Sequence, residues 1–226
     1  MNNTYRIKEI SEKLDIAGFF PLDVLVIGST GAGKSSTMNA LFQSHVSKVG
    51  EGCDPETMKI SSYRLNNLLR FWDSPGLGDG IAQDYQHSKK LVDLLYEEYR
   101  VNGRPYGLID TVLVILDGSG RDMGTTYRIL NEIVVPNFPK DRIFVALNQA
   151  DMAMKGRHWD NLTNQPDSHL QEFLDEKVKS IQKRVLEATG VSIHRPVYYS
   201  ANKEYNVDRL MDMIIDYMPT ERRRFM

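Results

Sequence analysis

The sequence has 226 residues, of which 41% are hydrophobic and 26% charged, and its formal net charge is −2. These values are typical of a globular protein of one domain with small additions. No apolar run approaches the roughly 18 residues that would span a membrane, and the charged N-terminus lacks the apolar core of a signal peptide. We therefore expect a cytoplasmic protein. The net charge argues against nucleic-acid binding over the whole surface, and a single Cys53 excludes an internal disulfide.

The first twenty residues carry a helical pattern. Apolar residues recur at helical spacing across residues 7–17, with Asn3 or Thr4 as the expected N-cap and Gly18 at the end. Three acidic side chains in this stretch argue against an anchor on an anionic membrane surface. We expect residues 1–20 to form an N-terminal helical extension that packs on the domain.

The rest of the chain alternates apolar runs typical of strands with amphipathic segments typical of helices. This order predicts an α/β fold of three layers, with a mostly parallel central sheet of about six strands. Ligands of such sheets lie beyond the carboxyl ends of the strands. The expected strands cover residues 24–27, 59–65, 68–72, 109–116, 143–147 and 196–199, with a turn at Asn66 and Asn67; the expected helices cover residues 36–42, 86–99, 123–134, 168–190 (with Ser168 and Gln171 as a capping box) and 207–218.

A glycine-rich segment follows the first expected strand. Residues 28–35, GSTGAGKS, fit the P-loop form G-x-x-x-x-G-K-[ST] between a strand and a helix. Its backbone N–H groups and the helix N-terminus would surround an anion. Lys34 would neutralise the outer phosphates of a nucleotide, and the Ser35 hydroxyl would ligate Mg²⁺. The expected phosphate-binding residues are Ser29, Thr30, Gly31, Ala32, Gly33, Lys34, Ser35 and Ser36.

A second polar segment closes a buried strand at residues 148–151, NQAD. It resembles the [NT]-[KQ]-x-D signature of guanine-nucleotide-binding proteins. A carboxylate at Asp151 can accept from both the ring N–H and the amine of guanine, whereas adenine has an acceptor in place of that ring donor. Asn148 would contact the base and the P-loop, and Gln149 stands where a Lys is more common. Ser200 and Ala201 resemble the [ST]-A element, whose backbone N–H groups bind the guanine carbonyl.

A third segment, residues 73–76 or DSPG, resembles the D-x-x-G motif of the same proteins. Asp73 would hold Mg²⁺ through water, and the N–H of Gly76 would reach the γ-phosphate. Thr57 lies where these proteins place a switch threonine that joins Mg²⁺ and the γ-phosphate. The expected metal ligands are thus Ser35, Thr57 and Asp73, and the expected catalytic groups are Lys34, Thr57 and Gly76.

The order of these motifs resembles that of the translation-factor-related P-loop GTPases, most closely the Era-like branch. The resemblance implies a G domain over residues 21–219 that binds GTP or GDP with Mg²⁺ and acts as a switch. Leu77 follows DSPG where many small GTPases have a water-orienting Gln, and Gly31 stands where potassium-activated members have Asn. The first departure predicts slow intrinsic hydrolysis that speeds up when an activating protein, a second copy or a monovalent cation supplies charge, and the second argues against activation by potassium.

Other functions stay open at this stage. The chain could be a module that binds GTP constitutively and dimerises across the nucleotide face, or an ATP-dependent enzyme of another P-loop class. RNA or the ribosome is a partner implied by the family resemblance only. Residues 152–167 form an expected insert in which Trp159 serves either partner contact or internal packing. Residues 220–226 are expected to be a basic tail, more typical of a solvated segment than of an RNA contact.

Overall fold

A computed structural model describes residues 4–42, 61–74, 76, 81–120 and 124–224. Six strands form one sheet in the order β10-β7-β6-β1-β3-β2, and every neighbouring pair is parallel except the antiparallel pair β2 and β3. The predicted sheet is thereby confirmed. The strands are β1 (Leu22–Gly28), β2 (Ser61–Arg64), β3 (Leu69–Asp73), β6 (Thr111–Asp117), β7 (Ile143–Asn148) and β10 (Val197–Tyr198).

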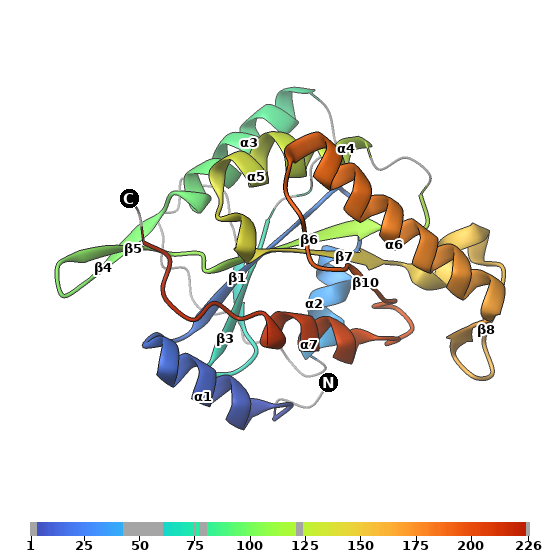
Figure 1. The fold of residues 1–226 in the computed structure, drawn as a ribbon, viewed down its shortest axis with the longest axis horizontal. Helices are drawn as coiled ribbons and strands as arrows, with labels where there is room; N and C mark the ends of the chain where they lie inside the picture. The colour runs from blue at the N-terminus through green and yellow to red at the C-terminus, as the bar shows by residue number, and fades with distance from the viewer. Residues whose placement is uncertain (1–3, 43–60, 75, 77–80, 121–123, 225–226) are drawn as a thin grey trace.

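Helices cover both faces of this sheet, which gives the three predicted layers (Figure 1). The central strands β1, β6 and β7 are buried almost throughout, as expected for strands with both faces covered. Two apolar clusters, one on each face, form the core. One face carries α1 (Ile7–Ala17), α2 (Lys34–Phe42) and α7 (Val207–Asp216), and the other carries α3 (Ile81–Leu95), α4 (Gly124–Arg128), the π-helix η1 (Ile129–Val134), α5 (Val135–Asn137) and α6 (Ser168–Thr189).

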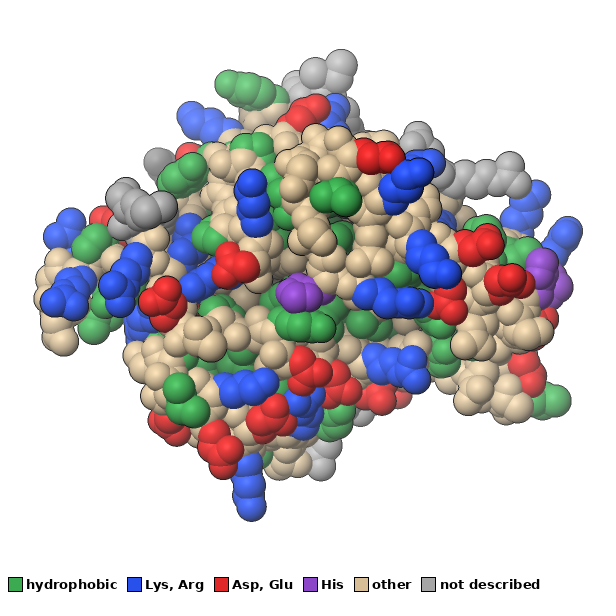
Figure 2. Space-filling model, in the orientation of Figure 1, with side chains coloured by type: hydrophobic (Ala, Val, Ile, Leu, Met, Phe, Trp, Pro, Cys, Tyr) green, Lys and Arg blue, Asp and Glu red, His purple; other side chains and the backbone are tan. Residues whose placement is uncertain are grey.

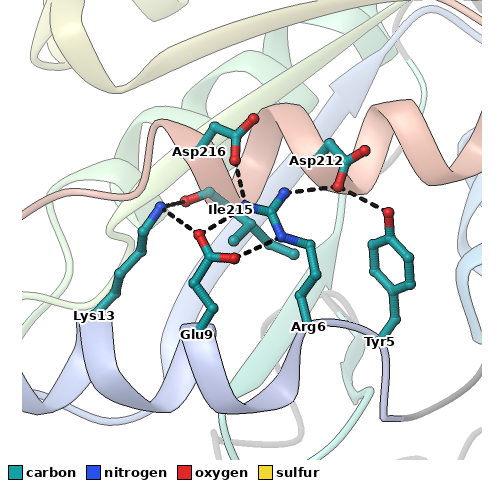
Figure 3. Close-up of polar contacts among 7 residues, drawn as sticks. All are labelled: Tyr5, Arg6, Glu9, Lys13, Asp212, Ile215 and Asp216. Atoms are coloured by element: carbon teal, nitrogen blue, oxygen red, sulfur yellow. Dashed lines mark hydrogen bonds and ion pairs between the residues drawn. The ribbon is translucent and has the colours of Figure 1, made fainter.

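The N-terminal helix α1 packs on the domain as predicted. Its buried residues Ile10 and Leu14 join the core, and its polar side faces α7. The Arg6 guanidinium donates to Asp212 at 2.7 Å and to Asp216 at 2.5 Å, both on α7 (Figure 3). The predicted N-cap is wrong: Arg6 occupies that position with φ 48° and makes no capping bond from its side chain.

Among the helices that the structure describes, none is long and apolar enough to cross a membrane.

The β2–β3 hairpin confirms a predicted pair of strands but not the predicted turn. Neither Asn66 nor Asn67 has a positive φ. Instead the side chain of Asn66 accepts hydrogen bonds from the N–H groups of Leu68 at 2.8 Å and Leu69 at 3.0 Å. The turn is therefore an Asx type, in which the side chain mimics a backbone acceptor.

A second hairpin corrects the helix that the sequence predicts to reach residue 99. The helix α3 ends at Leu95, and β4 (Glu98–Val101) pairs with β5 (Arg104–Gly107) in antiparallel fashion. Asn102 and Gly103 form the turn with φ values of 51° and 78°, the backbone that an Asn-Gly pair favours. The hairpin extends away from the main sheet (Figure 1). In Figure 2 basic side chains gather over it, whereas the rest of that face mixes both signs of charge.

Two of the three C-terminal arginines, Arg222 and Arg223, pack against the domain, in contrast to the solvated tail expected from the sequence. Arg223 is only 5% exposed, and its guanidinium donates to the carbonyls of Ile109 at 2.8 Å and Leu95 at 2.6 Å. The Arg222 guanidinium packs over the rings of Tyr99 and Tyr106, 5.1 and 5.5 Å from their centroids. These contacts fasten residues 222–223 to the second hairpin and to the edge of the core.

We expect the Arg223→Met variant to be less stable than the wild type by about 1–3 kcal/mol, because two buried carbonyls lose charged donors. The loss is limited, since burial also disfavours the charge and lowers the pKa of Arg223 to about 10. Urea unfolding followed by circular dichroism measures the difference. Arg224→Met is the matched control, because the Arg224 side chain is 67% exposed. Equal unfolding midpoints for both variants would show that Arg223 does not contribute.

The insert is more ordered than the sequence suggests. It contains the 3₁₀ segment η3 (Ala150–Gly156) and a short hairpin of β8 (Trp159–Asp160) and β9 (Gln165–Pro166). Trp159 is 9% exposed and lies edge-on against Tyr205, with ring centroids 5.1 Å apart, so it serves packing rather than partner contact. The predicted capping box after the insert is wrong, because Asp167 caps α6 by accepting from the N–H of Leu170 at 2.9 Å.

Candidate nucleotide-binding site

The glycine-rich loop joins β1 to α2 at the carboxyl edge of the sheet. Gly33 has φ 85°, and a Cβ built there would lie 2.2 Å from Nδ2 of Asn148, so this position requires glycine. The carbonyl of Gly33 accepts from both the N–H and the hydroxyl of Thr37, each at 2.8 Å. The loop is therefore fixed at its helix end, where the N-terminus of α2 can meet an anion.

Lys34 lies over this loop and is largely buried. Its Nζ donates to the carbonyls of Gly28 at 3.1 Å and Ser29 at 3.2 Å, so the ammonium already sits at the loop that would hold phosphates. Ser35 and Ser36 begin α2 with exposed side chains, which leaves their hydroxyls accessible. The predicted phosphate-binding residues thus lie together.

Asp73 ends β3, the strand next to β1, and it supplies a carboxylate on the same side. Its Oδ1 is buried and has no hydrogen-bond partner among the described residues. Burial raises the pKa of Asp73, and the nearby charge of Lys34 opposes that shift. A buried, unsatisfied carboxylate oxygen near an accessible serine fits Mg²⁺, which keeps several waters and takes few protein ligands. The described residues include no cluster of three or more His, Cys, Asp or Glu side chains suited to a metal.

Asn148 connects three loops of the site. Its Nδ2 donates to the carbonyl of Ala32 at 3.0 Å, and its Oδ1 accepts from the N–H of Ala201 at 3.0 Å. The neighbouring Gln149 donates from Nε2 to the carbonyl of Gly31 at 2.7 Å. The NQAD segment is therefore bonded directly to the P-loop, as the sequence predicts for Asn148.

Asp151 lines a cavity of about 240 Å³ beside the P-loop. Asp151 is 5% exposed, and its Oδ1 is buried with no hydrogen-bond partner within the described parts of the chain. A buried carboxylate oxygen without a hydrogen-bond partner is costly, so a ligand that donates a hydrogen bond to Oδ1 would be favoured here. The cavity is lined by Gly31, Gly33, Ser36, Asn148, Gln149, Asp151, Met152, Ser200, Ala201 and Asn202.

The Ser200–Ala201 loop lines the same cavity, and its N–H groups make hydrogen bonds within the protein. The N–H of Ser200 donates to the carbonyl of Tyr205 at 3.0 Å, and the N–H of Ala201 is the donor to Asn148. Both amides are therefore paired within the protein. In this structure the loop shapes the cavity, and the predicted contact of these amides with a base carbonyl stays a prediction.

Two supporting residues escape the sequence analysis. Tyr199, fully buried before the Ser200–Ala201 loop, has its hydroxyl 2.7 Å from that of Thr37, which in turn bonds the P-loop. Burial raises the pKa of Tyr199 well above its usual value. Lys177 on α6 donates to the carbonyls of Gly118 at 2.7 Å and Gly120 at 2.8 Å, which holds the loop after β6. The sequence places Tyr199 at the end of a predicted strand but does not indicate its contact with Thr37. Nothing in the sequence indicates the role of Lys177.

The structure brings most of the predicted residues to one edge of the sheet. These are the loop after β1, Asp73 and Gly76 after β3, the NQAD segment after β7 and the Ser200–Ala201 loop after β10. Thr57 and Leu77 lie outside the described residues, so the prediction for the switch threonine stays a prediction. The P-loop follows β1, and Asn148 connects it to the cavity that Asp151 lines. This arrangement defines a protein of the P-loop GTPase class.

The comparison with protein families gives the same class. Residues 23–149 match the model of a family described as 50S ribosome-binding GTPase. The chain belongs to this family, which confirms the predicted resemblance to P-loop GTPases.

Known proteins are similar over most of the chain. MJ0920 of Methanocaldococcus jannaschii is 24% identical over 208 residues, which cover 86% of this chain and 95% of that protein. Toc33 from Arabidopsis thaliana, solved with Mg²⁺ and GMPPNP, aligns with a TM-score of 0.62 at 17% identity over 95% of this chain and 91% of its own. Era, solved with MgGDPNP and nucleotides of 16S ribosomal RNA, aligns with a TM-score of 0.55 at 21% identity over 89% of this chain and 58% of its own. These two structures share the fold.

Other curated relatives are longer than the matched region. The chain spans 7% of one of them and 41% of another. What those whole proteins do therefore does not transfer to this chain.

Proposed function

We propose that the protein binds GTP and GDP with Mg²⁺, hydrolyses GTP slowly and acts as a molecular switch. The observation that carries this proposal is the unpaired Oδ1 of Asp151 in a cavity that Asn148 joins to the P-loop. Guanine offers two donors to a carboxylate, whereas adenine would leave it unpaired. Membership of a GTPase family supports the same assignment.

The residues of the chain divide the chemistry between them. Lys34 and the loop amides would neutralise the phosphates, and the N–H of Gly76 would meet the γ-phosphate. Ser35 and Asp73, with Thr57 as the expected third residue, would hold Mg²⁺, which supplies charge neutralisation on the outer phosphate oxygens. A loose phosphoryl-transfer transition state needs mainly such positioning and charge.

Slow hydrolysis follows from the side chain after DSPG. Leu77 can neither donate nor accept a hydrogen bond, so it cannot orient the attacking water as a Gln does. Gly31 offers no side-chain oxygen for a monovalent cation. We propose that an activating partner supplies the missing group, and that the protein works in the cytosol.

The direct test is nucleotide affinity. Titration of nucleotide-free protein with fluorescent GTP, GDP and ATP, each with Mg²⁺ and with EDTA, should show tight binding of both guanine nucleotides and weak binding of ATP. EDTA should weaken the binding of GTP. Equal affinity for ATP and GTP would overturn the assignment and favour another P-loop class.

The dimerising module is the alternative function, and turnover at several protein concentrations tests it. For a switch that needs a different partner, we expect GTP turnover per molecule to stay constant from low to high protein concentration. Phosphate release with a fixed excess of GTP, checked by light scattering for oligomeric state, measures this. Turnover that rises with concentration, together with a larger scattering mass, would favour activation across the nucleotide face.

An RNA or ribosomal partner rests on family resemblance. The family description names 50S ribosome binding, and the Era structure holds nucleotides of 16S ribosomal RNA. For this chain such a partner is a proposal that GTP-dependent cosedimentation with ribosomal subunits would test.

A further inference from the structure

A histidine on α3 contacts the glycine of the DSPG motif. Nδ1 of His87 lies 3.0 Å from the carbonyl oxygen of Gly76. A carbonyl can only accept, so Nδ1 must carry the hydrogen of this bond. His87 is half-buried, which limits competition from water. The contact ties the motif glycine to a helix eleven residues further along the chain.

Gly76 is also in close contact with the P-loop. A Cβ built on Gly76 would lie 2.5 Å from Oγ1 of Thr30 and 3.0 Å from Cα of Thr30. Only glycine can lie this close without displacing the loop. The backbone of Gly76 therefore lies close both to Thr30, a predicted phosphate-binding residue, and to His87 on α3.

We propose that His87 is a positioning residue that holds Gly76 ready for the third phosphate, and so makes the site favour GTP over GDP. The inference rests on the proposed function, since it assumes that this loop binds guanine nucleotides. A glycine peptide without an anchor samples many conformations, and ordering it costs free energy on binding. The bond from His87 removes part of that cost in advance. GDP has no γ-phosphate, so its affinity should not depend on this anchor.

Three variants separate the anchor from a general effect on the helix. His87→Asn keeps a donor at the position of Nδ1, because the side-chain amide nitrogen of Asn is also three bonds from Cα. His87→Gln moves the donor one bond further, and His87→Ala removes it. Gln86→Ala is the matched control, since Gln86 is an exposed neighbour on α3.

The measurement is the ratio of affinities for a non-hydrolysable GTP analogue and for GDP. In His87→Ala and His87→Gln we expect about 3- to 10-fold weaker binding of the analogue, the effect of one hydrogen bond, with GDP unchanged. His87→Asn should restore the ratio, and Gln86→Ala should not alter it. Thermal melting of each variant without nucleotide shows whether it folds. If only one of His87→Ala and His87→Gln folds, its affinity ratio alone tests the proposal.

The outcomes distinguish the two proposals. Wild-type protein that binds neither guanine nucleotide overturns the proposed function and this inference with it. If the wild type binds both but the ratio is unchanged, or rises, in the two loss variants, the role of His87 alone is overturned. Equal weakening of GDP and the analogue, or failure of His87→Asn to restore the ratio, overturns it as well.

Discussion

Removing the ammonium of Lys34 should weaken the binding of GTP and GDP by at least about 100-fold. Its Nζ lies within hydrogen-bond distance of the carbonyls of Gly28 and Ser29, at the loop where phosphates would bind. Charged hydrogen bonds contribute about 1.5–3 kcal/mol each, and the ammonium can make two to the outer phosphates. Two such bonds correspond to about two to four orders of magnitude in affinity.

The experiment compares Lys34→Ala and Lys34→Met with the wild type by titration with fluorescent GDP and a GTP analogue. Methionine keeps an apolar stem of similar length, so it separates loss of charge from loss of packing. Lys155→Ala removes the same charge from an exposed position in the insert and should bind normally. Affinities of the Lys34 variants within twofold of wild type would contradict the phosphate site.

The central sheet could be predicted because its strands are recognisable from composition. The strands β1, β6 and β7 each contain a continuous apolar run, which is typical of strands buried on both faces. Their carboxyl ends carry the motifs, so the location of the site followed from the topology. The type of turn between β2 and β3 could not be predicted, because Asn66 can form a turn either through its backbone or through its side chain.

The errors lie where distant segments decide the structure. Helical periodicity predicts a helix to residue 99, but the structure forms a hairpin there, because the two short strands pair with each other and have little sequence pattern of their own. The buried state of Arg223 depends on carbonyls of Leu95 and Ile109, more than a hundred residues away. A run of arginines contains no sign of such partners.

The candidate site could likewise be predicted only in part. Motif spacing identified which residues line it, because each chemical role requires a particular side chain. It could not foresee that the N–H groups of Ser200 and Ala201 are used within the protein, nor that Tyr199 and His87 support the loops. These are backbone and second-layer contacts, and they depend on tertiary geometry rather than on a motif.

Replacing Asp151 with asparagine should change the base preference from guanine to xanthine. The wild-type carboxylate can accept from two donors of guanine, and its Oδ1 has no hydrogen-bond partner in the described structure. Asparagine presents an amide N–H₂ that cannot pair with the guanine amine, so GTP binding should weaken by about 100-fold or more. Xanthine carries a carbonyl in place of that amine and matches the amide.

The test is the affinity of Asp151→Asn for GDP and XDP beside that of the wild type. Asp93→Asn changes an exposed carboxylate on α3 and should leave both affinities as in the wild type. Because the exchange inverts a preference, misfolding cannot imitate it: a damaged protein would lose both nucleotides. If Asp151→Asn bound GDP as tightly as the wild type, the base would lie elsewhere. If it lost GDP without gaining XDP, recognition of the base by the Asp151 carboxylate would be overturned.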